Sequence, residues 1–101
     1  MDKENLTELQ QLLKSLSYSK AVDFLFALED SPKSFTEIEE LVKAPAKVIN
    51  DNRVRLWKAG LIRPVIDEEK YSTRAKYELT PLGQRILTKL KEIKNILAKS
   101  K

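Results

Sequence analysis

The strongest constraint on the fold is residues 43–62, a stretch that marks both ends of one helix and leads directly into a strand. Pro45 suits a first helical turn, where its missing N–H has no partner, and Gly60 tolerates the left-handed backbone that ends a helix. The residues after Gly60 are rich in strand-forming side chains. We therefore predict a helix over residues 45–59 that is followed at once by a strand.

This helix is expected to have two different faces. Ile49, Leu56 and Ala59 recur at helical spacing and are expected to point into the core. The opposite face carries mainly cationic and amide side chains, namely Lys47, Asn50, Asp51, Val54, Arg55 and Lys58. Our working hypothesis is that this outer face recognises DNA.

Composition excludes most kinds of chemistry. The chain has 101 residues, enough for one hydrophobic core, and contains neither Cys nor His. A disulfide, an ordinary zinc site, a thiolate nucleophile and an imidazole base are therefore excluded, and two glycines are too few for a phosphate-binding loop. We expect no enzyme activity, no metal and no cofactor, and no small-molecule effector is evident from the sequence.

Charge is distributed unevenly along the chain. The net charge is −4 over residues 1–45, +3 over residues 46–80 and +5 over residues 81–101. An acidic front and a basic rear indicate that the rear binds a polyanion, and nucleic acid is the commonest one. A solvated, Lys-rich surface of the thermophile type is the alternative.

No segment has the pattern of a membrane span. The longest apolar run, residues 24–28, is far shorter than the roughly 20 residues that a span needs, and the N-terminus does not resemble a signal peptide. We expect a cytoplasmic protein that is associated with the nucleoid and does not contact a membrane.

Three helices are expected before residue 43. A leucine stripe predicts a helix over residues 3–16, and Ser19 is placed to cap a second helix that runs to about Glu29. Residues 30–34 are typical of a turn.

The third helix is expected to begin at a capping box. Thr36 and Glu39 have the required spacing, and Ile38, Leu41 and Val42 would then point inward. Only a tight turn separates this helix from the one that follows, so the two form a helix-turn-helix pair.

A two-stranded hairpin is predicted after that pair. Residues 61–66 are β-rich, residues 75–79 alternate apolar and polar, and residues 67–73 between them are polar without periodicity. Pro64 lacks a donor for the ladder and therefore marks an edge strand.

Two segments that flank this hairpin carry a family resemblance. Lys58-Ala59-Gly60-Leu61-Ile62 resembles the xxGLI signature that ends the recognition helix of winged-helix regulators, and residues 74–83, RAKYELTPLG, resemble their RxxYxLTxxG signature at the return strand of the wing. Over residues 21–97 the chain is thus similar to the HxlR, PadR, MarR and ArsR regulators of prokaryotes. It is also similar to small archaeal winged-helix proteins that end in a coiled-coil helix. The implied fold is mainly α with a small β-hairpin, a winged helix-turn-helix with a long C-terminal dimerisation helix.

The chain departs from the family pattern at Arg53, where an apolar residue usually precedes Leu56 by three. A buried, unpaired guanidinium would be costly. Either Arg53 reaches the rim and pairs with Glu37, Glu39 or Glu40, or the helix is rotated so that Asn52 and Val54 take different faces.

The last helix is predicted over residues 81–99, with Thr80 as N-cap and Pro81 in the first turn. Its apolar stripe has coiled-coil spacing and extends beyond what one core covers, so we expect a homodimer through this helix, with the N-terminal helix alongside. The predicted interface residues are Leu6, Leu9, Leu13, Leu16, Ile86, Leu90, Ile93 and Leu97. The alternative is that the two terminal helices pack on each other within one chain.

The expected function is that of a homodimeric, sequence-specific regulator of transcription that binds double-stranded DNA. The whole chain, residues 1–101, would be a single domain, with an N-terminal helix at 3–17, the helix-turn-helix and wing at 19–80, and the C-terminal helix at 81–99. Helix 45–59 would enter the major groove, and wing residues 67–76 would lie on the adjacent minor groove or backbone. The predicted DNA contacts are Lys47, Asn50, Asp51, Arg53, Val54, Arg55 and Lys58 of the helix, and Lys70, Ser72, Thr73, Arg74 and Lys76 of the wing.

Two alternatives remain open. The protein could be architectural and coat DNA without sequence preference, or its winged helix could be a module that binds another protein. Steep salt dependence without sequence preference would favour the first, and DNA affinity that does not depend on the cationic residues would favour the second.

Overall fold

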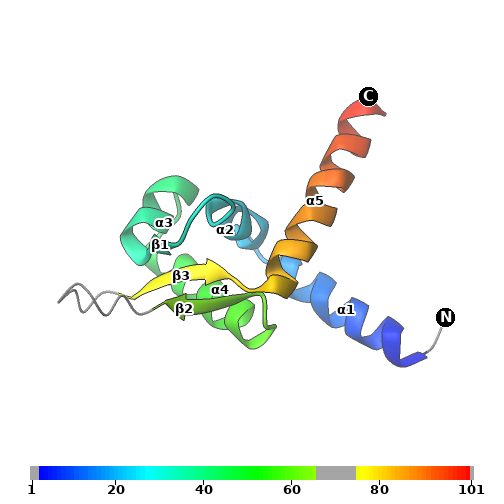
Figure 1. Ribbon diagram of the computed structural model, residues 1–101, viewed down its shortest axis with the longest axis horizontal. Helices are drawn as coiled ribbons and strands as arrows, with labels where there is room; N and C mark the ends of the chain where they lie inside the picture. Colours follow the sequence, from blue (N-terminus) through cyan, green and yellow to red (C-terminus); the bar gives the residue numbers. More distant parts are fainter. Residues whose placement is uncertain (1–2, 66–74, 101) are drawn as a thin grey trace.

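The computed structural model describes residues 3–65 and 75–100 (Figure 1). Five helices and three short strands follow one another in this part of the chain. The elements are α1 (Lys3–Ser17), α2 (Ala21–Ala27), β1 (Lys33–Ser34), α3 (Phe35–Val42), α4 (Ala46–Lys58), β2 (Ile62–Val65), β3 (Lys76–Leu79) and α5 (Pro81–Lys99). The mainly helical fold with a hairpin before the last helix is as predicted.

The sheet has three strands, in the order β1-β3-β2, and both pairings are antiparallel. The predicted two-stranded hairpin was therefore incomplete, because Lys33 and Ser34, expected in a turn, pair with Tyr77 and Lys76. Two residues are too few to show a strand periodicity in sequence. Pro64 lies on the edge strand β2, as its missing donor predicted.

Two predicted helix caps were wrong. Helix α2 begins after Lys20, whose φ is 68°, and no side chain caps it. The capping box of α3 is formed by Ser34 and Glu37, two residues earlier than expected: Ser34 Oγ accepts from the Glu37 N–H at 3.2 Å, and Glu37 Oε1 accepts from the Ser34 N–H at 3.1 Å. The shift arises because β1 runs directly into α3 without an intervening loop.

The core lies between α2, α3, α4 and the sheet. Its buried residues are Phe24, Leu25, Leu28, Ile38, Val42, Ile49, Leu56, Leu61, Ile62, Leu79 and Leu87. Leu41 was expected to point inward but is 57% exposed. Ile38 and Val42, four residues apart, already define the buried side of α3, and Leu41 lies at its edge.

The first turn of α5 is joined to the end of α4. Thr80 Oγ1 accepts from the Gly83 N–H at 3.0 Å and donates to the Gly60 carbonyl at 2.5 Å, so the predicted N-cap is confirmed and has a second partner. Gly83 packs so closely that a Cβ there would lie 2.0 Å from the Leu61 carbonyl oxygen. These contacts fix where α5 leaves the sheet.

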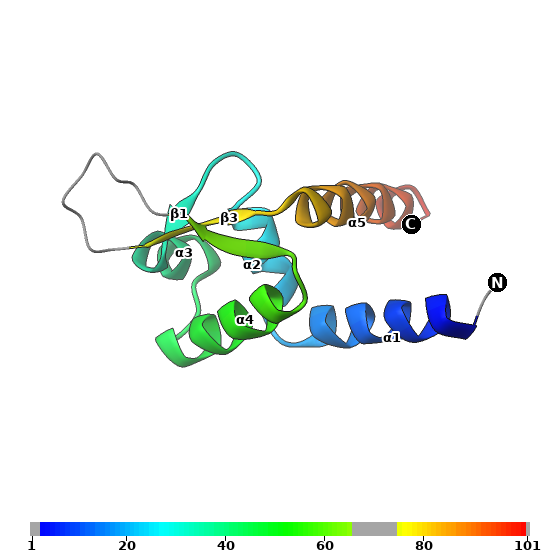
Figure 2. The ribbon, with the colours of Figure 1, turned by 60° about the horizontal axis from the view of Figure 1, so that its bottom comes forward.

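Helices α1 and α5 both extend from the same end of the molecule (Figure 2). Helix α1 packs against α2, and α5 packs against α2 and β3. Both helices keep exposed apolar side chains: Leu6, Leu9, Leu13, Leu82, Ile93, Ile96 and Leu97. The two helices therefore do not cover each other's apolar faces within one chain.

Candidate nucleic-acid interface

Helix α4 lies under the sheet with one side in the core. Ile49 and Leu56 are fully buried and Ala59 is partly buried, as predicted. Asn52 completes this inner side with 1% exposure, and its Nδ2 donates to the Ser19 carbonyl at 2.9 Å. Its Oδ1 has no hydrogen-bond partner among the described residues. The helix is thus rotated so that Asn52 points inward and Val54 outward. This is the second of the two alternatives that the sequence left open.

Arg53 therefore stays out of the core and lies on the hairpin side of α4. Its Nε and Nη2 donate to Asn50 Oδ1 at 3.1 and 2.9 Å, and its guanidinium carbon lies 5.8 Å from the centre of the Tyr77 ring on β3. These partners replace the glutamates of α3 that we considered. Because Asn50 holds it, the guanidinium is oriented along the outer surface of α4.

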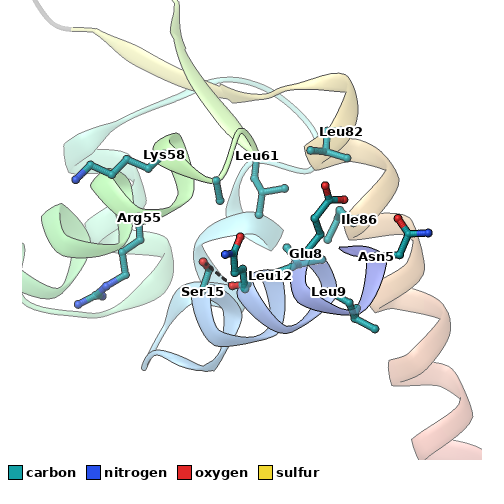
Figure 3. A pocket seen from close by; sticks show the side chains of 12 residues that line it. Asn5, Glu8, Leu9, Leu12, Ser15, Arg55, Lys58, Leu61, Leu82 and Ile86 are labelled. Atoms are coloured by element: carbon teal, nitrogen blue, oxygen red, sulfur yellow. Dashed lines mark hydrogen bonds between the residues drawn. The ribbon is translucent and has the colours of Figure 1, made fainter. Parts of the chain in front are cut away.

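Arg55 lies on the opposite edge of α4. Its guanidinium carbon is 3.6 Å from the centre of the Tyr18 ring, a close cation–π contact that joins α4 to the segment between α1 and α2. Arg55 and Lys58 also line a groove of about 620 Å³ between α1, the end of α4 and the start of α5 (Figure 3). Leu9, Leu12 and Ile86 contribute to the apolar part of this groove. Arg55 is thus half-buried and does not point straight outward.

The remaining predicted contacts on α4 occupy its outward surface. Lys47, with 85% of its side chain exposed, pairs with Asp51 at 3.2 Å. Asn50 and Lys58 are exposed, and Val54 is half-buried. The structure thus brings these five side chains onto one surface, while Arg53 and Arg55 form its two edges.

The hairpin beside this surface is described only at its base. Lys76 is exposed on β3, and Arg63 Nε donates to Glu78 Oε2 at 2.7 Å across the two strands. The predicted wing contacts Lys70, Ser72, Thr73 and Arg74 lie outside the described residues.

Solved structures share this arrangement, although the sequence matches no protein-family model and no curated protein. The homodimeric winged helix-turn-helix DNA-binding domain Mb0332 of Mycobacterium bovis, a possible ArsR-family transcriptional regulator, is 13% identical, with a TM-score of 0.78 over 100% of this chain and 94% of that one. The fold is the winged helix-turn-helix. The transcriptional repressor BigR of Xylella fastidiosa is 19% identical, with a TM-score of 0.76 over 98% and 93% of the two chains. HlyU of Vibrio cholerae is 16% identical, with a TM-score of 0.74 over 91% and 97%.

Within this winged helix, α3 and α4 form the helix-turn-helix pair, and β2 and β3 form the base of the wing. The structure adds two residues that the sequence analysis did not assign to the site. Tyr18 holds Arg55, and Trp57 is 47% exposed on the last turn of α4. Helical spacing from Asn50 and Val54 could have placed Trp57 on the outer face, because residues three, four and seven apart share one side of a helix. Tyr18 could not have been found, because its contact joins residues that are far apart in sequence.

Metal binding and membrane insertion are two further possibilities for the described residues. Residues 3–65 and 75–100 contain no group of three or more His, Cys, Asp or Glu that could hold a metal ion. In the same ranges, no helix is long and apolar enough to cross a membrane.

Proposed function

We propose that the protein is a cytoplasmic regulator of transcription, without enzyme activity, that binds double-stranded DNA in a sequence-specific manner as a homodimer. The observation that carries this proposal is the outward surface of α4, which presents Lys47, Asn50, Val54 and Lys58 beside the base of the wing. The shared fold with a DNA-binding domain and with a transcriptional repressor supports it.

The side chains of α4 suit different parts of a DNA duplex. Asn50 carries hydrogen-bonding groups suited to a base edge, and Val54 suits a thymine methyl. Arg53, which Asn50 holds at 2.9 Å, suits either a guanine or a neighbouring phosphate. Lys47 and Lys58 suit phosphates, which give affinity and position without reading sequence. Arg55, held by Tyr18, would reach a phosphate at the edge of the interface.

The wing completes the proposed interface. Lys76 on β3, together with Lys70, Ser72, Thr73 and Arg74, would contact the adjacent minor groove or backbone. Asp51, bonded to Lys47, would orient that lysine in place of making its own contact with phosphate.

The homodimer would form through α5 with α1 alongside. Leu6, Leu9, Leu13, Ile93 and Leu97 are exposed in the single chain, and the half-buried Leu16, Ile86 and Leu90 continue the same faces. Together with the groove between α1 and α5, they form an exposed apolar surface of the kind that marks a protein interface. A two-fold axis through this surface would set two α4 helices about 34 Å apart and favour a pseudo-palindromic operator.

Selection of bound fragments from random duplex DNA tests this function. We expect one enriched pseudo-palindrome, and fluorescence anisotropy should show tighter binding to it than to random duplex. Removing two phosphate contacts, Lys47→Ala with Lys58→Ala, should weaken binding by about tenfold or more and make it less salt-dependent.

The matched control is Arg85→Ala with Lys99→Ala, which removes the same charge from the exposed surface of α5. Equal binding of selected and random duplexes with steep salt dependence would instead support an architectural protein. Affinity that is unchanged in both double variants would exclude α4 as the DNA-binding helix and favour a protein-interaction module.

A further inference from the structure

Trp57 is an exposed aromatic side chain on the helix proposed to bind DNA. It is the only tryptophan in the sequence, and 47% of its surface is exposed on the last turn of α4. Ile49 and Leu56 point into the core from the inner side of the same helix. The indole lies outside that core, and its exposed part is accessible to a partner.

The proposed dimer surface does not supply that partner. Seven of the exposed large apolar side chains lie on α1 and α5, as described above. Arg55 faces α1 across the groove described above, and two residues along an α-helix differ by about 200° in direction. Trp57 is therefore on the opposite edge of α4, away from α1.

Trp57 forms one wall of a shallow hollow of about 470 Å³ on α4, together with Arg53, Val54 and Lys58. Val54 and Trp57 make the apolar part of its lining, and Arg53 and Lys58 make the cationic part. Asn50 Oδ1 holds the Arg53 guanidinium at 2.9 Å, so this charge is already oriented. The acidic residue on the outer face, Asp51, is bonded to Lys47. Within residues 3–65 and 75–100, no carboxylate pairs with Arg53 or Lys58, so the hollow combines apolar surface with positive charge.

We propose that this hollow holds one nucleotide of the DNA backbone, with the Trp57 indole packed on the deoxyribose. Indole has an apolar face and a single N–H donor, so Nε1 can donate to a phosphate oxygen while the ring covers the sugar. Arg53 and Lys58 would neutralise the phosphates on either side. Because contacts with the DNA backbone carry no information on base sequence, Trp57 would position α4 on the duplex without contributing to sequence specificity. This inference rests on the proposed function.

Intrinsic fluorescence tests the contact directly, because all tryptophan emission comes from Trp57. We expect acrylamide to quench the free protein readily and to lose much of this quenching when saturating duplex DNA is added. Unchanged quenching in a complex that anisotropy shows to be saturated would overturn the proposal. Quenching that falls with protein concentration in the absence of DNA would also overturn it, because a second protein chain would then cover the indole.

Substitution tests the energetic role. Trp57→Ala should weaken binding about tenfold, the loss typical of one well-packed contact residue, and by the same factor for selected and random duplexes. Trp57→Phe keeps an aromatic ring but loses the indole N–H, so its affinity should lie between that of Trp57→Ala and the wild type. Leu41→Ala, which truncates another exposed apolar residue away from α4, is the matched control and should bind as the wild type does.

Circular dichroism of each variant keeps folding defects separate from binding defects. If the wild type binds no duplex, the proposed function fails before Trp57 is tested. If the wild type binds and Trp57→Ala binds equally well, the function stands and this inference fails. A loss confined to selected duplex would show that Trp57 reads a base, which also contradicts a backbone contact.

Discussion

The body of the molecule and its terminal helices use the same apolar periodicity with opposite results. In the body, formed by α2 to β3, Phe24, Leu25 and Ile49 are fully buried. On the terminal helices, Leu13 and Leu97 are 54% and 60% exposed. The difference lies in the number of neighbouring elements, because the body has helices and a sheet on several sides, whereas α1 and α5 extend beyond it. An amphipathic stripe thus indicates that a surface is to be covered, without saying by which chain.

The largest effect should follow from a cavity in the body. Ile49→Ala removes a fully buried side chain between α4 and the rest of the core, and should lower the free energy of unfolding by about 3 kcal/mol. Urea denaturation at fixed protein concentration measures this change. Leu41→Ala, at an exposed position, should cost less than about 0.5 kcal/mol. Similar losses in the two variants would mean that the body is not the stable part.

The second-largest loss of stability should follow from overpacking where α5 joins the body. A Cβ at Gly83 would lie 2.0 Å from the Leu61 carbonyl oxygen, so Gly83→Ala must displace α5 from the sheet. We expect a loss of about 2–3 kcal/mol in the free energy of unfolding, measured by thermal denaturation. Gln84→Ala, on the exposed side of the same turn, is the control. If Gly83→Ala left the free energy of unfolding unchanged, α5 would be only loosely attached to the sheet.

The terminal helices should behave in the opposite way. Ile93→Glu or Leu13→Glu should change the unfolding of the isolated chain little, yet should weaken the proposed dimer about 100-fold by burying an unpaired charge. Size-exclusion chromatography with light scattering measures the oligomeric state. Thr88→Glu, on the polar side of α5, should remain dimeric. A monomeric wild type at micromolar concentration would remove the need for a partner chain.

The smallest effect concerns a surface carboxylate of the body. The Ser34 backbone N–H, followed by the Ser34 side chain, lowers the pKa of Glu37 below its ordinary value of 4.5. A carboxyl group whose pKa is lowered on folding stabilises the protein above its unfolded pKa, and this contribution is lost as pH falls through the folded pKa. The stability difference between the wild type and Glu37→Gln should therefore be constant near neutral pH and shrink below about pH 4.5. Urea denaturation from pH 7 to pH 3, with Glu40→Gln as control, checks this.

Local signals were sufficient for much of the fold. Gly60, with φ of 78°, ends α4 as predicted, and Thr80 with Pro81 begins α5. In these cases the residue and its partner are a few positions apart, so the sequence shows both. The strand β1 was missed because it depends on β3, more than forty residues later in the chain. The capping box at Ser34 is local, since Glu37 lies three residues on, but Thr36 and Glu39 show the same spacing, and the sequence analysis chose that pair.

Asn52 shows the same limit at the candidate site. Its position between Ile49 and Leu56 has the correct spacing for the core, but the sequence left its face open. The acceptor that permits burial is the Ser19 carbonyl, 33 residues away. Conversely, Arg53 looked like a core position from the family pattern and is accommodated outside by Asn50 and Tyr77. The faces of α4 were thus predictable from spacing, whereas the polar exceptions depend on tertiary partners.

The two hydrogen bonds of Thr80 have a mechanical consequence. A single hydroxyl links the carbonyl of Gly60, just beyond α4, to the first turn of α5. Helix α5 has 19 residues and is therefore about 28 Å long, so a tilt of about 5° at its first turn would move its far end by about 2.5 Å. In the proposed dimer α5 is a lever arm with Thr80 near its pivot, and the stiffness of this one joint would decide how much variation in half-site spacing the protein tolerates.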